Sequence, residues 1–299
     1  MRILKWATAF LLWMATASPS AGADWAGLVE RLADDGFDRP TVEALFARPE
    51  VTFEPDAMAG KLKVLIRNRS ADTESAAARL RTVIRRGYLQ SGIISRARSY
   101  LRENTEVLNE IAALYDVPRE IIVSILLIET HLGRNTGHSR VFNRLASMAR
   151  CTDLETIRPY LARTLITPDT EAYARRRCRE KADWAYEELK ALIRYAERDG
   201  VDPLDIRGSI YGAIGMCQFM PTNVFSFGVD ADGDGRIDPF AKPDALHSIA
   251  NYLREHGWHR NLDRRGQHRV IFDYNHSTVY ANTVLAVAEK IGMKKVSRH

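Results

Sequence analysis

The run "IIVSILLIET", residues 121–130, places the strongest constraint on the fold. Seven of the eight residues from Ile121 to Ile128 are hydrophobic, so this segment belongs inside the protein. Its β-branched residues would also suit a buried strand. The flanks favour a helix, because Asp116 is a suitable N-cap, Pro118 fits a first turn and Gly133 can end a helix. We therefore predict a buried helix.

Glu129 is the misfit in this helix. On a wheel of 100° per residue, it points away from Ser124, which belongs to the polar face, and lies with Ile125 on the apolar side. Burial and the negative end of the helix both raise the pKa of a carboxyl group. A carboxylic acid that keeps its proton near neutral pH is what a general acid requires. The alternative is an ordinary ion pair between Glu129 and Arg134 or Arg140.

The remaining periodic segments are also typical of helices. Apolar residues recur at three- and four-residue spacing through 24–105 and 152–200, and again through 243–257 and 277–292. Gly200 is the expected stop of the second segment. No series of alternating strands and no repeat is found, so we predict a mainly α protein in which any sheet is small and local.

The N-terminus has the pattern of a signal peptide. Arg2 and Lys5 precede an apolar stretch that ends near Ala17, and the small residues 21–23 fit a cleavage site. The stretch is shorter than the roughly 20 residues that span a bilayer. We predict that residues 1–23 are removed and that the chain is exported to the periplasm or cell envelope, the alternative being an uncleaved anchor. No cysteine lies near the cleavage point to accept a lipid.

Charge and cysteine content restrict the partners further. The net charge of +5 falls slightly when the leader is removed, and no basic stripe with interleaved aromatics is present. Nucleic acid is therefore not an expected partner, although a mild positive charge suits an acidic envelope polymer. Cys151 and Cys178 flank a polar helical segment and either form a disulfide or remain thiols. Cys217 is then the odd cysteine, and we expect it to be a buried small side chain.

The segment "DADGDGRID" matches the start of a calcium-binding loop. Carboxylates fall at positions 1, 3 and 5, and Gly235 at position 6 allows the sharp turn. Position 12 is Ala241 instead of glutamate, so Asp244 would close the site from the next helix. We predict a structural calcium ion, the alternative being a metal-free Asp/Gly turn. The expected ligands are the carboxylates of Asp230, Asp232, Asp234 and Asp244 and the backbone carbonyl of Arg236.

Two further segments carry polar groups beside glycine or aromatic residues. "GSIYGAIGMCQFMP", residues 208–221, has glycines whose spacing permits close backbone approach, together with Ser209 and Gln218. "FDYNHSTVY", residues 272–280, places Tyr274 before a helix. Each segment alone is more typical of a packed turn or a helix cap than of a binding site, although a tyrosine can also line a carbohydrate cleft.

Taken in order along residues 117–280, these four segments together resemble the lytic murein transglycosylases of the membrane-bound lytic transglycosylase B type. That resemblance implies a lysozyme-like catalytic core, related to the SLT and goose-type lysozyme folds, with an additional helical domain and an EF-hand-like calcium loop. We expect an N-terminal helical region over 24–108 and a catalytic core over 109–299. Residues 150–205 would be a helical insertion packed with the N-terminal region.

The same resemblance implies roles for individual residues. Glu129 corresponds to the family's single catalytic acid and base. The substrate contacts that it implies are Ser209, Gln218 and Tyr274. The arginines that similar enzymes carry in a "YPRR"-like stretch after the catalytic helix have no clear counterpart, and the candidates are Arg150 and Arg158.

The implied activity is that of a carbon–oxygen lyase acting on peptidoglycan glycan strands. Glu129 would protonate the β-1,4 bond between N-acetylmuramic acid and N-acetylglucosamine, then deprotonate the muramyl C6 hydroxyl to give a 1,6-anhydromuramyl end. Most glycosidases require a second carboxyl group. Intramolecular attack by the C6 hydroxyl does not, because no water has to be activated. We expect a monomer that meets cell-wall synthesis or remodelling proteins. The alternatives are a goose-type lysozyme hydrolase and a non-catalytic peptidoglycan-binding protein.

Overall fold

The computed structural model describes residues 24–71 and 82–293, and the predicted leader over 1–23 lies outside these ranges. The prediction of a mainly α protein is confirmed. In the described part, no helix is both long and apolar enough to cross a membrane. The longer helices are α1 Ala26–Asp34, α2 Arg39–Phe46, α3 Pro55–Ala71, α5 Ser91–Glu103, α6 Thr105–Tyr115, α7 Arg119–Thr130, α8 Val141–Arg150, α10 Pro168–Asp199, α12 Lys242–Glu255, α13 Arg264–Tyr274 and α14 Thr278–Gly292. The short ones are η1 Arg86–Leu89, α9 Leu154–Ile157, η2 Arg158–Tyr160, η3 Arg163–Leu165 and α11 Pro221–Phe227.

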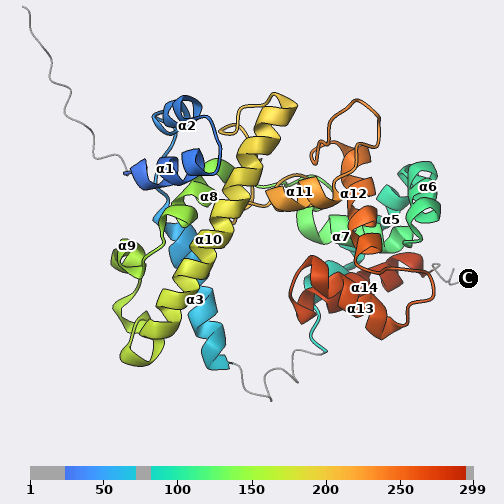
Figure 1. Ribbon diagram of the computed structural model, residues 1–299. Helices are drawn as coiled ribbons and strands as arrows, with labels where there is room; N and C mark the ends of the chain where they lie inside the picture. The colour runs from blue at the N-terminus through green and yellow to red at the C-terminus, as the bar shows by residue number, and fades with distance from the viewer. Residues whose placement is uncertain (1–23, 72–81, 294–299) are drawn as a thin grey trace, which may run out of the picture.

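The helices form two groups that α11 connects (Figure 1). In one group, the long helix α10 packs against α8 and α3, with α1, α2 and α9 around them. In the other, α7 packs against α14, α5, α12 and α6, and α13 covers α14. The helix that carries Glu129 is therefore enclosed by several neighbours.

Helix α10 has well-formed signals at both ends. Thr167 and Thr170 form a reciprocal capping box, and Pro168 occupies the first turn. Gly200 ends the helix with φ of 65°, a left-handed conformation that glycine adopts without strain. The predicted stop at Gly200 is thus confirmed. The helix has 32 residues and is the central element of the first group.

Helix α7 is buried on almost every side, since nine of its twelve residues are buried. This exceeds what the wheel predicted. Ser124, placed on a polar face by its sequence position, is fully buried and donates its hydroxyl to the Glu120 carbonyl at 2.6 Å. A short hydroxyl can enter the core this way because the carbonyl of the preceding turn satisfies it.

The ends of α7 differ from the prediction. Asp116 is not its N-cap: it is the left-handed C-cap of α6, with φ of 59°, and its carboxylate pairs with Arg260 at 2.7 Å. Pro118 takes the N-cap position instead. At the other end, the chain turns left-handed at His131, two residues before Gly133. The tight turn that follows brings the end of α7 against the glycine-rich segment.

A two-stranded sheet lies beside that segment. Strand β1, Ser139–Arg140, runs antiparallel to β2, Arg207–Gly208, with Ser139 opposite Gly208. The approach is close at Gly137, because a Cβ added there would lie 2.1 Å from the Gly208 carbonyl oxygen. The sheet is small and local, as predicted.

The burial of α7 predicts a large effect of truncating Leu126, which is 0% exposed. Leu126→Ala should lower the free energy of unfolding by about 2–5 kcal/mol, because it removes apolar contacts and leaves a cavity. Leu114, 58% exposed on α6, is the matched control, and Leu114→Ala should change the free energy of unfolding by less than about 0.5 kcal/mol. Urea unfolding of both variants measures the difference, and equal losses would contradict the packing described.

Candidate active site

Glu129 stands in the last turn of α7 and is held by a tyrosine from α14. The hydroxyl of Tyr280 donates to Oε1 of Glu129 at 2.6 Å. Tyr280 is 2% exposed, whereas Glu129 keeps partial access to solvent. The carboxyl group therefore has one oxygen fixed by a buried donor, in a residue that is itself not fully enclosed.

Burial raises the pKa of Glu129 to about 7. The hydrogen bond from Tyr280 and the positive charge of Arg85 act in the opposite direction, because both favour the carboxylate, but they do not outweigh desolvation. The direction agrees with that expected from the sequence. At neutral pH a substantial fraction of Glu129 carries a proton to donate.

The alternative of an ion pair between Glu129 and a nearby arginine is not found. In the described residues, the hydrogen-bond partner of the Glu129 side chain is Tyr280, and no ion pair joins Glu129 to Arg134 or Arg140. The Arg140 guanidinium instead donates to the backbone carbonyls of Leu204 at 2.8 Å and Glu50 at 3.1 Å. Glu129 is thus left with a neutral hydrogen-bond partner.

Tyr274 lies beside Tyr280, with parallel rings whose centroids are 6.5 Å apart. Its hydroxyl donates to the Cys217 carbonyl at 2.6 Å. Burial, first of all, holds the pKa of Tyr274 well above its usual value. The structure therefore commits the hydroxyl of this predicted substrate contact to the backbone of the glycine-rich segment, and its ring lies beside that of Tyr280, the donor to Glu129.

The glycine-rich segment is attached directly to the end of α7. Thr130, the residue after Glu129, donates its hydroxyl to the Met216 carbonyl at 3.0 Å. Gly133 makes the approach possible, since a Cβ there would lie 2.3 Å from the Met216 methyl carbon. This contact sets the position of the segment relative to the carboxyl group.

Ser209 and Gln218, the other predicted substrate contacts, both lie in this segment and are half-buried. The Ser209 hydroxyl accepts from the backbone N–H of Ala213 at 3.0 Å. The Gln218 amide nitrogen donates to the carbonyls of Thr136 at 3.0 Å and Gly215 at 2.9 Å. Both side chains are thereby held in fixed orientations.

The arginines proposed from the sequence lie elsewhere. Arg150 donates to the Asp24 carbonyl at 2.7 Å, and Arg158 pairs with Glu155 at 2.8 Å and Glu171 at 2.8 Å. These contacts hold both guanidinium groups within the first helix group, so neither is brought to the glycine-rich segment.

One basic residue of α3 does approach that segment, and a lysine of α10 lies near it. Lys61 of α3 has its ammonium nitrogen 4.5 Å from the centre of the Tyr211 ring, and that of Lys181 lies 5.1 Å from the centre of the Trp184 ring. Burial, and then the neighbouring charges of Lys181 and Arg177, lower the pKa of Lys61. The sequence offered no signal for this cluster, because α3 is more than a hundred residues distant from its partners along the chain.

Two further tyrosines near Glu129 have no signal in the sequence that links them to it. Tyr280 ends the segment 272–280 that contains Tyr274, but its spacing in the sequence does not indicate a contact with Glu129. Tyr88, in η1, donates to the Ile128 carbonyl at 3.3 Å and stacks on His131 with ring centroids 6.1 Å apart. Both contacts join segments that are distant in sequence.

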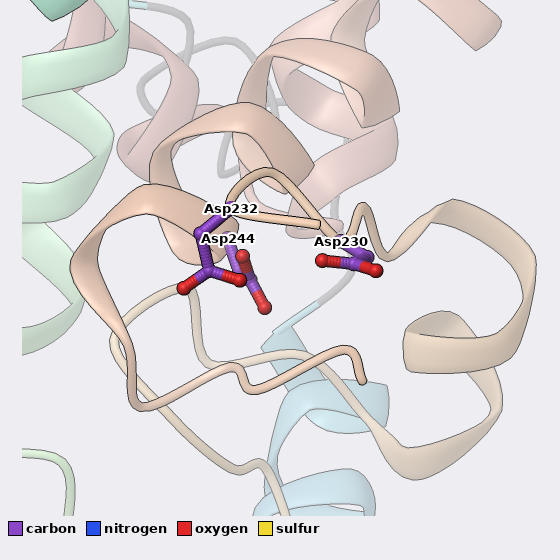
Figure 2. A group of neighbouring side chains, drawn as sticks. All are labelled: Asp230, Asp232 and Asp244. Carbon is purple, nitrogen blue, oxygen red and sulfur yellow. The ribbon is translucent and has the colours of Figure 1, made fainter. Parts of the chain in front are cut away.

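The predicted calcium loop brings three carboxylates together (Figure 2). Oxygen atoms of Asp230, Asp232 and Asp244 all lie within 4.8 Å of one another. Asp234 is not in this group, and its carboxylate accepts from the backbone N–H of Arg236 at 2.8 Å. Three of the predicted carboxylate ligands thus converge.

The chemistry of this cluster fits a hard cation. Asp244 is 2% exposed and accepts from the backbone N–H groups of Ala231 at 2.9 Å and Asp238 at 2.7 Å. Its pKa is raised, first by burial and then by the negative charges of Asp232 and Asp230. A divalent cation would relieve that repulsion, and carboxylate oxygens are the ligands that Ca²⁺ prefers.

Comparison with known proteins places the chain in a family. The family model described as the transglycosylase SLT domain matches residues 20–267. The membrane-bound lytic murein transglycosylase B of Escherichia coli is 32% identical over 170 residues, which are 57% of this chain and 38% of that protein. The match therefore spans well under half of the relative's length.

Solved structures share the fold. Escherichia coli Slt35 in complex with calcium superposes with a TM-score of 0.66 at 21% identity, covering 90% of this chain and 95% of the other. SltB3 of Pseudomonas aeruginosa in complex with NAG-NAM-pentapeptide gives a TM-score of 0.63 at 22% identity, covering 89% and 78%. The lysozyme-like fold expected from the sequence is confirmed, and the chain belongs to the transglycosylase SLT domain family.

Proposed function

We propose that this chain is a peptidoglycan lytic transglycosylase with Glu129 as its single general acid and base. The observation that carries the proposal is the desolvated Glu129 carboxyl group, which has a pKa of about 7 and a hydrogen bond from Tyr280 in a partly exposed residue. Among the described residues, no acidic side chain contributes to that raised pKa. Family membership and the glycopeptide bound to SltB3 support the substrate class.

The proposed mechanism uses one carboxyl group twice. Protonated Glu129 donates its proton to the glycosidic oxygen between N-acetylmuramic acid and N-acetylglucosamine, and the bond to C1 breaks. The carboxylate then accepts the proton of the muramyl C6 hydroxyl as that oxygen bonds to C1, so no water is consumed. Tyr280 steadies the carboxylate between the two steps, because its hydroxyl donates to the charged form more strongly than to the neutral one.

Substrate contacts are proposed on the glycine-rich segment, residues 208–221, and on Tyr274 beside it. Ser209, Gln218 and the ring of Tyr274 lie on or against the segment that Thr130 ties to the end of α7. A goose-type lysozyme would use the same substrate contacts but admit water as the nucleophile. A non-catalytic binding protein would have no use for a proton on Glu129.

Glu129→Gln tests the catalytic assignment. The amide cannot exchange a proton, so release of soluble fragments from peptidoglycan should fall at least about 100-fold. Turbidity clearance of purified cell walls measures the rate. A variant that clears walls as fast as the wild type would show that Glu129 is not the acid.

The folding of that variant provides the control. A pKa of about 7 in the folded state, above the ordinary 4.5, favours folding below pH 4.5, and this stabilisation is lost as the pH rises to 7. Glutamine removes the cost of ionising a buried carboxyl group. At pH 8 the variant's free energy of unfolding should exceed that of the wild type by up to about 3 kcal/mol, with little difference at pH 4.

The pH dependence of activity tests the role of Tyr280. The kcat/KM of the wild type should decline as the pH rises through about 7, because the free enzyme must hold the proton on Glu129. Tyr280→Phe removes a donor that favours the carboxylate, so this decline should move to higher pH. Tyr160→Phe, at a side chain that is 54% exposed, should leave the profile unchanged. A decline at the same or lower pH in Tyr280→Phe would contradict the assignment.

We further propose that the Asp230, Asp232 and Asp244 cluster binds a structural calcium ion, with Asp234 and the Arg236 carbonyl as additional ligands. The converging carboxylate oxygens and the raised pKa of Asp244 support it. The calcium complex of Slt35 supports it by analogy. The ion would neutralise the cluster and hold the loop against the start of α12.

Calcium titration of thermal unfolding tests this site. The Tm of the wild type should rise with added Ca²⁺, by an amount that corresponds to about 2.7 kcal/mol at a hundredfold excess over Kd. Asp244→Asn should abolish most of the calcium-dependent rise, while Asp183→Asn, at an exposed position on α10, should keep it. A calcium response that survives Asp244→Asn would place the ion elsewhere.

The cellular setting and the domain division are proposals too. We propose export to the periplasm or cell envelope, action on glycan strands as a monomer, and contact with cell-wall synthesis or remodelling proteins. We also propose that residues 150–205 are an insertion that packs with the N-terminal region, which the contact of α10 with α3 supports. Helix α5 falls within the range 24–108, but it packs against α7 and α14. Its contacts therefore group it with the helices of the catalytic core.

A further inference from the structure

Two cysteines that are distant in sequence meet in the first helix group. Cys151 follows α8 as its C-cap, and Cys178 lies in α10, the helix packed against α8. The Sγ of Cys178 is 3.1 Å from the carbonyl oxygen of Cys151. Both residues are 0% exposed and are thiols in this structure, and the Cys151 thiol donates to the Ser147 carbonyl at 3.1 Å.

Small, fully buried side chains lie close to both cysteines along the chain. Ala174 and Ala182 lie one turn before and after Cys178 on α10, and Ala149 precedes Cys151 on α8; all three are 0% exposed. These residues allow the two helices to approach closely. The third cysteine, Cys217, is also buried, but its neighbours are Tyr274 and Glu129.

We propose that Cys151 and Cys178 form a disulfide that ties together the two ends of the segment 152–177. Formation requires the Cys151 side chain to leave the Ser147 carbonyl and turn toward Cys178. Two S–H bonds break and one S–S bond forms. The two electrons and two protons pass to a thiol oxidant, either a small-molecule disulfide or a disulfide oxidoreductase, which is released as two thiols.

Burial dictates when this bond forms. It raises the pKa of Cys151 to about 12 and that of Cys178 to about 11. The thiolate is the species that attacks a disulfide, so exchange is slow once α8 and α10 have packed. The disulfide therefore forms while the chain folds, and afterwards resists reductants until the protein unfolds.

The tie would act on a segment that is otherwise held at its surface by exposed ion pairs. Arg158 pairs with Glu155 and Glu171, and Arg175 pairs with Glu171 at 2.7 Å. Such pairs contribute little and weaken with salt. Within the same segment, η2 and η3 line a cavity of about 690 Å³ together with α3. A disulfide would hold η2 and η3 against this cavity independently of ionic strength.

Thiol counting tests the pairing directly. The full chain is unfolded with reductant, refolded with oxidised and reduced glutathione, then unfolded again and alkylated without reductant. Intact mass should show one alkylated thiol per chain, located on Cys217 by peptide mapping, and all three after reduction. Cys217→Ser should leave none, and Cys178→Ala should leave two. Three alkylated thiols after oxidative refolding, or a pair that includes Cys217, would overturn the proposal.

Timing and consequence are measured on the same material. Protein that has folded in the reduced state should acquire the disulfide much more slowly than protein refolded with the oxidant. The oxidised form should melt roughly 5–10 °C above the reduced form, at low and at high salt. A double variant, Cys151→Ser with Cys178→Ser, should melt at one temperature with or without reductant. These results do not depend on peptidoglycan cleavage. Equal melting temperatures of the oxidised and reduced wild type would overturn the proposal that the disulfide stabilises this segment.

Discussion

The enclosure of α7 is the constraint on which the site depends. The helix is buried along nearly its whole length, and its last turn delivers a carboxyl group to a place where water cannot fully solvate it. Burying a carboxylate is unfavourable, so Glu129 keeps its proton to a higher pH than an exposed glutamate. The hydrogen bond from Tyr280 limits that shift and leaves the pKa about 7, where the group can both donate and accept a proton.

The rest of the site is built outward from the end of this helix. Thr130 fixes the glycine-rich segment through the Met216 carbonyl, and Tyr274 fixes it through the neighbouring Cys217 carbonyl. The wall that faces the substrate in the proposed function is therefore positioned by contacts to its backbone.

The sequence predicted what depends on local pattern. Apolar periodicity indicated the helices, Gly200 marked the end of α10, and aspartate spacing indicated the loop where Asp230 and Asp244 meet. It failed where distant segments decide. The prediction that Asp116 is the N-cap of α7 was wrong. Asp116 is instead the left-handed C-cap of α6 and pairs with Arg260, 144 residues away. The donor to Glu129 was missed for the same reason, since α14 reaches α7 only in the folded chain.

Analysis of the products formed from purified peptidoglycan tests the central claim most directly. If Glu129 serves first as acid and then as base for the muramyl C6 hydroxyl, mass spectrometry of the wild-type digest should show 1,6-anhydromuramyl ends, each lighter by one water than a reducing end. Reducing muramic acid ends from the outset of the digest would contradict the account, because they would show that water is the nucleophile.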